Sequence, residues 1–300
     1  MPFTARRSTA NGATVALALA IAYAASGTTF VILKLVSHHI PPVQLTATRL
    51  LGAGTVLAPF AVRRVRQMSS RPSWNEVRAA AVTGLLLLTI GQTGLIWGVA
   101  TMPIGVAAVI GSSAPLFIAL FTLLTPHGSL PRRQLAGVLF GLVGIAALAW
   151  SAPQGEISLI GITALLVSAA AWAAGSLHGR SGGGSSDPLV SITLQLLIGG
   201  AAVLPLAIAE GVVSGQRIDP TGLSVQALGG IAVLIAVAIA AFGSFTWLNR
   251  NTSSTVANTF SYVAPILALI LGAVLFGESL GVLKLTAAAM ALIGVAMMIR

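Results

Sequence analysis

Long segments without any charged side chain constrain this fold more than any other feature of the sequence. A helix needs about 20 consecutive apolar residues to cross a membrane. Charged residues make up only 7% of this chain, whereas soluble domains contain roughly a quarter. We therefore expect an all-α protein that crosses a membrane many times. The uncharged segments are residues 8–33, 79–131, 134–155, 157–179, 188–209, 220–249 and 251–277.

Glycine, proline and charged residues divide these segments into ten expected helices. The apolar stretch after Arg7 continues to Leu33. It is longer than the apolar core of a signal peptide, so we interpret it as a retained first helix. The expected helices span residues 13–33, 44–62, 78–99, 104–125, 132–150, 158–178, 189–209, 224–248, 253–276 and 282–299.

Lysine and arginine are unevenly divided between the two sets of expected loops. Cytoplasmic loops of membrane proteins are enriched in these residues, so we expect the richer set, and with it both termini, on the cytoplasmic side of a bacterial inner membrane. The richer set comprises Arg6, Arg7, Arg63, Arg64, Arg66, Arg71, Arg78, Arg132, Arg133, Arg180, Arg250 and Arg300, against Lys34, Arg217 and Lys284 on the outer side.

The net charge of +10 follows from the same asymmetry. In a soluble protein such a charge would suggest nucleic acid as a partner. Here the arginines flank apolar helices, where they are expected to contact anionic lipid headgroups. We predict the lipid bilayer as a partner, and no nucleic acid.

The sequence carries no recognisable catalytic or cofactor motif. It contains no cysteine, and no group of His, Asp and Glu has the spacing of metal ligands. The segment SGGGSS (181–186) is rich in glycine but lacks the lysine of a phosphate-binding loop. We expect no enzymatic activity, no cofactor and no metal.

The chain resembles itself when it is shifted by 150 residues. At this offset GVAAVIGSSAPLFIAL (105–120) lies over TVANTFSYVAPILALI (255–270). Offsets of 149 and 146 residues align the earlier helices of the two halves, so the repeats are residues 1–150 and 151–300. The aligned pairs include Trp97 with Trp247, Pro115 with Pro265, Tyr23 with Trp172, Pro42 with Pro188 and Arg49 with Gln195.

Each repeat contains five expected helices, so the second repeat would enter the membrane from the opposite side. Transporters with such inverted repeats bind their substrate near the middle of the membrane, between the halves. The alternative is a repeat that serves packing alone. We predict ten transmembrane helices, arranged as two inverted five-helix repeats around a central cavity.

Several short motifs resemble the EamA-type branch of the drug/metabolite transporter superfamily, over nearly the full chain. They are YAASG and WAAGS in the first and sixth expected helices, Ala-Pro in the fourth and ninth, and FGESL (276–280). The first repeat has HGSL (127–130) in place of the last motif. The resemblance implies a cavity between helices 1, 3, 4, 6, 8 and 9. It also implies alternating access, export of amino acids or related metabolites, and a monomer or homodimer.

Polar and aromatic side chains in the middle of the expected helices are candidate substrate contacts. Polar groups inside a bilayer usually face the protein interior or a cavity. Alternatively, Ser and Thr bond to carbonyls of their own helix, and the aromatic residues pack against lipid or lie at the membrane surface. The candidates are Tyr23, Gln92, Trp97, Ser112, Trp172, Phe242, Trp247, Asn258, Thr259 and Tyr262.

The ninth expected helix carries a polar cluster that its counterpart lacks. Asn258, Tyr262 and Pro265 are spaced to share one helical face. Because Ala108, Val109 and Ser112 of the first repeat stand in place of Asn258, Thr259 and Tyr262, we predict that the second copy determines substrate selectivity.

Two prolines occupy matching positions in the fourth and ninth expected helices. Pro115 and Pro265 each remove one backbone hydrogen bond and open the preceding turn. They form either static kinks that widen the cavity or hinges of the two gates.

Arg49 is the only charge that lies clearly within an expected helix. One interpretation is that its side chain snorkels to the outer interface. Another is ligand binding, and a third is an ionic latch with Glu278 on the outer side, near Lys34 and Lys284. Because the aligned residue is Gln195, such a latch would exist in one half only.

All six acidic residues lie in loops or at the ends of expected helices. No proton carrier is therefore evident inside the membrane, and facilitated diffusion or exchange are alternatives to proton coupling. The lack of a mid-span acid argues against small cationic drugs. With Arg49 assigned to the outer end of its helix, the lack of a mid-span cation argues against phosphate esters.

We therefore expect an inner-membrane transporter that exports neutral amino acids, including apolar and aromatic ones, or similar zwitterionic metabolites. The alternatives are efflux of drugs or other metabolites, and a lipid flippase or non-transport membrane subunit on the same scaffold. A flippase needs a polar groove open to lipid, so Gln92 and Asn258 on an enclosed cavity would argue against it.

Overall fold

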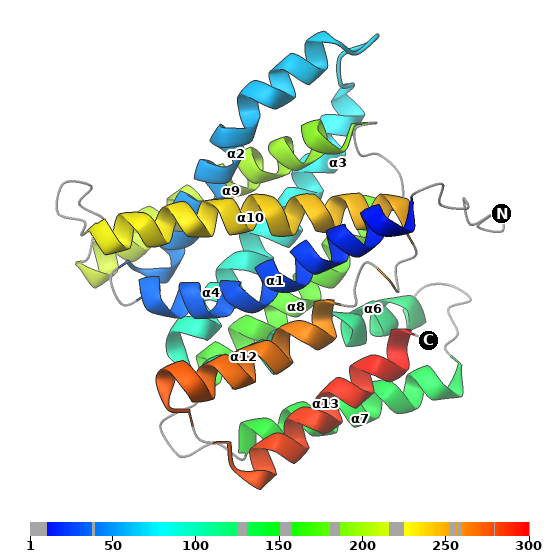
Figure 1. Ribbon diagram of the computed structural model, residues 1–300, viewed down its shortest axis with the longest axis vertical. Coiled ribbons are helices and arrows are strands. Elements are labelled where there is room, and N and C mark those ends of the chain that lie inside the picture. The colour runs from blue at the N-terminus through cyan, green and yellow to red at the C-terminus, as the bar shows by residue number, and fades with distance from the viewer. Residues whose placement is uncertain are drawn as a thin grey trace.

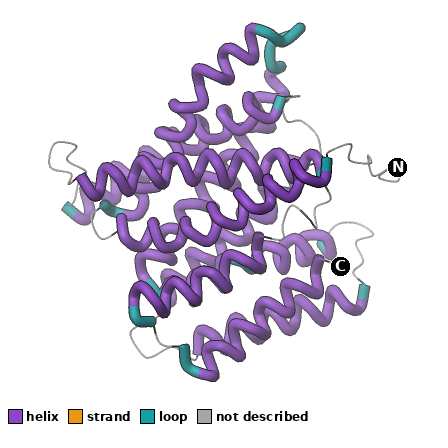
Figure 2. Tube along the Cα trace, viewed as in Figure 1, coloured by secondary structure: helices purple, strands orange, loops and turns teal. Residues whose placement is uncertain are grey.

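Helices account for almost every residue that the structure describes. The computed structural model describes residues 11–37, 40–124, 131–150, 158–180, 187–215, 225–252, 256, 260–278 and 280–299. These residues form a bundle of helices and short turns, with no strand among them (Figures 1 and 2). The all-α class predicted from the apolar segments is confirmed.

The helices begin and end close to the predicted positions. The third expected helix corresponds to α3, the π-helix η1 and α4 in succession, and the fourth to α5 and α6. In chain order the helices are α1 (Gly12–Ser37), α2 (Pro42–Arg66), α3 (Trp74–Gly84), η1 (Leu85–Gly91), α4 (Gln92–Thr101), α5 (Ile104–Gly111), α6 (Ala114–Leu123), α7 (Arg132–Trp150), α8 (Leu159–Arg180), α9 (Pro188–Ser214), α10 (Val225–Asn251), α12 (Phe260–Phe276) and α13 (Val282–Ile299).

Seven helices among the described residues are long and apolar enough to cross a membrane. Shorter apolar helices span Val263–Phe276 and Val282–Gly294. The protein is therefore a helical membrane protein, and the count of ten spans stays a prediction. The seven helices are Gly12–Val36, Pro42–Arg66, Trp74–Thr101, Ile104–Phe121, Leu159–Gly179, Pro188–Ser214 and Ala227–Asn249.

Helices from the two halves of the chain pack against each other throughout the bundle. α2 packs along α9, and α7 along α13. α1 contacts α10 and α12, while α8 contacts η1 and α4, and also α5 and α6. Exchanging each helix for its repeat mate leaves this set of pairings unchanged. The start of α1 and the end of α13 lie at the same end of the bundle (Figure 1).

The winding of the third expected helix changes at its centre, where η1 interrupts it between α3 and α4. Thr89 in η1 donates its hydroxyl to the carbonyl of Gly199 in α9, at 2.8 Å. A Cβ added at Gly84 would lie only 2.8 Å from the carbonyl oxygen of Gln195. Glycine is therefore required for this close approach of α3 to α9, next to a π-helical turn of the kind that often marks functional positions.

The wall between α4 and α8 also depends on a small residue. A Cβ added at Gly94 would lie 2.5 Å from the carbonyl oxygen of Ala164 and 3.0 Å from Cβ of Ser168. The Ser168 hydroxyl donates to the carbonyl of Gly91, at 2.6 Å. Small residues let membrane helices approach closely enough for such bonds, so the position of Ser168 beside α4 is well defined.

A break divides α5 from α6 at Ser112 and Ser113. Pro115 is the second residue of α6, where a missing N–H removes no helical hydrogen bond. Pro265 lies inside α12 instead, so the two prolines occupy different places in their helices. Their role as hinges stays a prediction.

Charged side chains fasten α2 to α9 at both ends. Arg64 Nε lies 2.6 Å from Asp187 Oδ2, and Asp187 also accepts hydrogen bonds from two amides of the first turn of α9, at 2.9 and 3.3 Å. At the other end Glu210 accepts from two amides of the first turn of α2, both at 3.0 Å. The two helices are therefore antiparallel and fixed in register.

The pair Asp187–Arg64 predicts a pH-dependent stability. Burial alone raises the pKa of the Asp187 carboxyl, but the hydrogen bond from Arg64, the bonds from the first amides of α9 and the Arg64 charge outweigh it and lower that pKa below 3.8. The charged carboxylate therefore stabilises the fold above pH 3.8, and this contribution is lost as pH falls through the lower folded pKa.

We expect Asp187→Asn to lower the melting temperature at pH 7, and the deficit to shrink towards pH 3. Asn still caps a helix, so Asp187→Ala should cost about 0.5–2 kcal/mol more, at every pH. Thermal unfolding of the purified protein from pH 7 to pH 3 measures both effects. A deficit for Asp187→Asn that is equal at pH 7 and pH 3 would contradict the electrostatic contribution.

Candidate functional site

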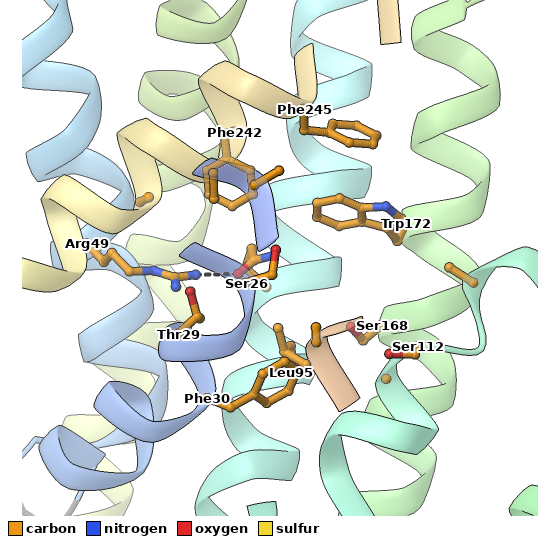
Figure 3. Close-up of a pocket in the computed structure, with 17 residues that line it drawn as sticks. Ser26, Thr29, Phe30, Arg49, Leu95, Ser112, Ser168, Trp172, Phe242 and Phe245 are labelled. Carbon is orange, nitrogen blue, oxygen red and sulfur yellow. Dashed lines mark hydrogen bonds between the residues drawn. The ribbon is translucent and has the colours of Figure 1, made fainter. Parts of the chain in front are cut away.

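A cavity lies between helices of both halves of the chain (Figure 3). Its volume is about 110 Å³. A single water needs only about 10–15 Å³, so there is room for several waters or for a small solute. The lining residues are Ala22, Ser26, Thr29, Phe30, Arg49, Gln92, Leu95, Gly111, Ser112, Ala114, Ser168, Trp172, Ala238, Ala241, Phe242, Phe245 and Ala264.

An aromatic cluster forms one wall of the cavity. The ring of Trp172 on α8 lies 5.5 Å from that of Phe245 and 6.2 Å from that of Phe242, both on α10, measured between ring centroids. The Trp172 ring is tilted relative to both phenylalanine rings, at separations that aromatic pairs prefer. This wall offers a rigid apolar surface.

A buried charge lies opposite Trp172 on the other side of the cavity (Figure 3). The side chains of Arg49 on α2 and Trp172 on α8 enter the cavity from opposite sides, and the guanidinium points towards Trp172 (Figure 3). The residue is only 2% exposed, and its Nη2 donates a hydrogen bond to Oε1 of Gln92 on α4. Its Nε has no hydrogen-bond partner among the described residues. The cavity therefore has an apolar and a cationic side.

Hydroxyl groups complete the lining, and those of Thr29, Ser112 and Ser168 donate to backbone carbonyls. Ser112 donates to the carbonyl of Ala108 at 2.8 Å, and Thr29 to that of Ala25 at 2.5 Å. These bonds are the local arrangement expected for Ser and Thr in membrane helices. The hydroxyl oxygens can still accept a hydrogen bond from a solute.

Four of the predicted substrate contacts meet in this cavity: Gln92, Ser112, Trp172 and Phe242. They come from α4, the break between α5 and α6, α8 and α10, which only the tertiary fold brings together. The helices at the cavity are those that the family resemblance implied, with α2 in addition through Arg49.

Three other candidates lie elsewhere. Trp97 is 43% exposed and lines a separate groove between α4, α8 and η1. Trp247 packs against a small apolar cluster with Ala22 and Leu248. Tyr23 is half-buried and is not among the lining residues, although its neighbour Ala22 is. As sites of substrate contact, these three stay predictions without support from this arrangement.

The polar cluster of the ninth expected helix is only partly described. Asn258 and Thr259 lie outside the described residues. Tyr262 belongs to α12, but its side chain is outside the description as well. Ala264 on α12 lines the cavity, and the adjoining Pro265 is buried. The predicted selectivity role of this segment therefore stays a prediction.

The predicted position of Arg49 at the outer interface is wrong. A snorkelling side chain would be exposed at its tip, whereas Arg49 is buried and bonded to Gln92. The physical reason is the rotation of α2, which turns this residue towards the bundle interior. The number of residues between Arg49 and the end of its helix indicates how deep the residue lies in the membrane. It does not indicate whether the side chain points towards the lipid or towards the protein interior.

The structure does not contain the predicted ionic latch between Arg49 and Glu278, because Glu278 has other partners. Its carboxylate accepts from the amides of Ile104 at 2.5 Å and Gly105 at 3.2 Å, at the start of α5. These amides have no partner within the helix, and the positive end of the helix dipole favours a carboxylate. Glu278 therefore caps a helix of the other repeat.

Lys34 completes the arrangement around Glu278. Its ammonium donates to the carbonyls of Val99 and Met102 at the end of α4, each at 3.2 Å, and its charge interacts with that of Glu278. A cation thus meets the last carbonyls of α4 and an anion the first amides of α5. The turn between the two helices is held by both.

Sequence reasoning did not select Ser168 and Phe245 as substrate contacts, although both line the cavity. Ser168 precedes Trp172 by four residues, and Phe245 follows Phe242 by three. Residues at these spacings share a helical face, so the predicted aromatic residues already indicated the faces on which the two lie. Among the described residues, no group of His, Asp or Glu could hold a metal ion.

Comparison with known proteins shows that both halves of the chain match the same protein family. Residues 13–150 and 159–300 each match the model of the EamA-like transporter family. The chain is 29% identical over 279 residues to the inner membrane transporter YedA of Escherichia coli (strain K12), covering 88% of this chain and 83% of YedA.

Two further proteins are similar over most of their length. A probable amino-acid metabolite efflux pump of Salmonella typhimurium (strain LT2) is 25% identical over 281 residues, covering 89% of each chain. A solved crystal structure matches 96% of both chains with a TM-score of 0.66, at 21% identity. This last likeness shows a shared fold.

The separate partners of Arg49 and Glu278 predict that the two residues act independently. In a double-mutant cycle of Arg49→Gln and Glu278→Gln, we expect the changes in unfolding free energy to add within about 0.3–0.5 kcal/mol. The matched cycle of Lys34→Gln and Glu278→Gln should deviate from additivity, because these two charges interact. Thermal unfolding of the purified variants measures both. A deviation from additivity in the Arg49 cycle alone would contradict this expectation and support the ionic latch.

Proposed function

Because the chain belongs to the EamA-like transporter family, we propose that it exports neutral amino acids, including apolar and aromatic ones, or similar small zwitterionic metabolites. The protein is a membrane transporter. The single observation that supports this solute class is the cavity that combines an aromatic wall with the pair Arg49–Gln92. A solute with one apolar and one polar end matches these two sides.

The aromatic wall suits the apolar part of such a solute. Trp172, Phe242 and Phe245 form a surface from both α8 and α10, and burial of an apolar group against it is favourable by about 25 cal/mol per Å². The name of the Salmonella relative, a probable amino-acid metabolite efflux pump, agrees with this class of solute.

Alternating access is the mechanism that the architecture favours. In the proposed arrangement, residues 1–150 and 151–300 are inverted five-helix repeats, and the symmetric helix pairings support this relation. The cavity lies between the halves, so rocking of one against the other would expose it to each side in turn. The α5–α6 break before Pro115 and the matching Pro265 on α12 are candidate hinges.

The proposed location is the bacterial inner membrane, with both termini in the cytoplasm. The arginine-rich loops favour this orientation. The first residues of α1 and the last residues of α13 also lie at the same end of the bundle (Figure 1). The inner membrane is also the location given in the name of the relative YedA. The solute and the lipid bilayer are the proposed partners, and no catalytic step is part of the proposal.

A lipid flippase is less well supported. It would need polar side chains along a groove open to lipid, whereas Gln92 is only 5% exposed and lines the cavity. The groove beside Trp97 is lined largely by apolar side chains of α4 and α8. Efflux of drugs or other metabolites through the same cavity is the closer alternative.

Transport by purified protein in proteoliposomes tests the proposal. We expect saturable movement of labelled phenylalanine, leucine and tryptophan, measured with and without a pH gradient. A panel of amino acids of which none moves would contradict the proposal. Acceleration by the gradient would identify proton coupling, and its absence would favour facilitated diffusion or exchange.

A matched pair of variants tests the aromatic wall. Trp172→Ala should raise KM for tryptophan about two- to tenfold, since the loss of an aromatic contact costs about 0.5–1.5 kcal/mol and 1.4 kcal/mol corresponds to a factor of ten. KM for alanine should change little. Trp74→Ala is the control, because Trp74 is 76% exposed at the start of α3. Equal effects of both variants would contradict the assignment.

A further inference from the structure

We propose that Arg49 is the anion-recognition residue of the cavity, and that it binds the carboxylate of the transported solute. The carboxylate is then the required group, and the ammonium of an amino acid is dispensable. This inference rests on the proposed function, because it names the part of the solute that the transporter recognises.

The first support is the environment of the guanidinium. Arg49 is 2% exposed, and a buried cation is stable only with partners that compensate its lost hydration. The only hydrogen bond that the structure gives it is to Gln92, a neutral amide, while its Nε is without a partner among the described residues. The side chain lines the cavity, which is where a compensating anion can reach it.

The second support is the position of the acidic residues. Each described carboxylate is engaged at the end of a helix, away from Arg49. Glu76 belongs to the capping box of α3, and Asp187 pairs with Arg64. Glu210 caps α2 and Glu278 caps α5. Within the described part of the chain, no carboxylate therefore neutralises Arg49.

The third support is the comparison between the repeats. Gln195 occupies the position aligned with Arg49, is also buried, at 7% exposure, and donates to Ser191 Oγ of its own helix at 3.1 Å. The helix packing at this position therefore accommodates a neutral side chain and does not itself require a charge. The charge is present only in the repeat where the residue lines the cavity, which points to a role in binding.

The chemistry of the site selects a carboxylate. A guanidinium presents a planar set of donors that matches the two oxygens of a carboxylate. Across the cavity lies the ring of Trp172, and the ring of Phe242 lies beside the guanidinium (Figure 3). For an ammonium group the described lining offers hydroxyl and carbonyl oxygens but no carboxylate. The matching solute is therefore an apolar or aromatic monocarboxylate, with or without an amino group.

Competition against labelled phenylalanine in proteoliposomes tests this inference on the full-length protein. We expect 3-phenylpropionate, which lacks the amine, to compete within about threefold of phenylalanine, an estimate for the loss of one hydrogen bond to a neutral acceptor. Phenethylamine and phenylalaninamide, which lack the carboxylate, should compete at least about tenfold more weakly, since hydrogen bonds between charged groups are roughly twice as strong as neutral ones. Equal competition by all four compounds would overturn the inference.

Variants at position 49 supply the matched comparison. Arg49→Gln should abolish the preference for carboxylates, whereas Arg49→Lys should keep it with weaker competition, because lysine retains the charge but not the planar fork. Arg66→Gln is the control, because it removes the same charge from the exposed end of α2. Preserved carboxylate preference in Arg49→Gln would overturn the inference.

Thermal stabilisation of the purified protein separates this inference from the proposed function, because it requires binding but no transport. We expect 3-phenylpropionate to raise the melting temperature of the wild type and of Arg66→Gln, but not of Arg49→Gln. This result without transport of any solute would contradict the proposed function and leave the anion site standing. Equal stabilisation by phenethylamine, or stabilisation by chloride alone, would overturn the inference.

Discussion

The constraint on which this structure depends is that polar groups inside a membrane must find their partners within the protein. Helix ends show the consequence most clearly. Glu210 and Glu278 each cap a helix that belongs to the other half of the chain, and Lys34 meets the last carbonyls of α4. Glu210 and Glu278 thus hold the two halves together at the ends of the bundle.

Between these fastened ends the helices depart from regular winding. The π-helix η1 directly precedes Gln92, and the break between α5 and α6 falls at Ser112. Both irregularities adjoin the cavity, where Arg49 has fewer partners than the charges at the helix ends. The charged side chains at the ends of the bundle therefore have their hydrogen-bond partners within the protein. Arg49 at the cavity has fewer, and binding of a solute can supply the missing interactions.

The sequence predicted the helices well, because hydropathy over a long segment reports its environment directly. Predicting the cavity required the rotation of each helix, which periodicity constrains only weakly in segments that are apolar all round. Trp172 and Phe242, predicted as substrate contacts, line the cavity, whereas Trp97 lies in a separate groove. For Arg49 the sequence indicated its depth along α2, and only the fold revealed that it faces inward. Pro115 and Pro265 align in sequence, yet Pro115 is the second residue of α6, whereas Pro265 lies further inside α12.

In the binding mode proposed, a solute lies between the two halves of the chain, with its carboxylate at Arg49 and its apolar part at the aromatic wall. An experimental structure of the full-length protein with 3-phenylpropionate bound tests this claim most directly. We predict that the carboxylate lies within hydrogen-bond distance of the Arg49 guanidinium and that the ring contacts Trp172. A ligand in the groove beside Trp97, or one with its carboxylate turned away from Arg49, would contradict the account.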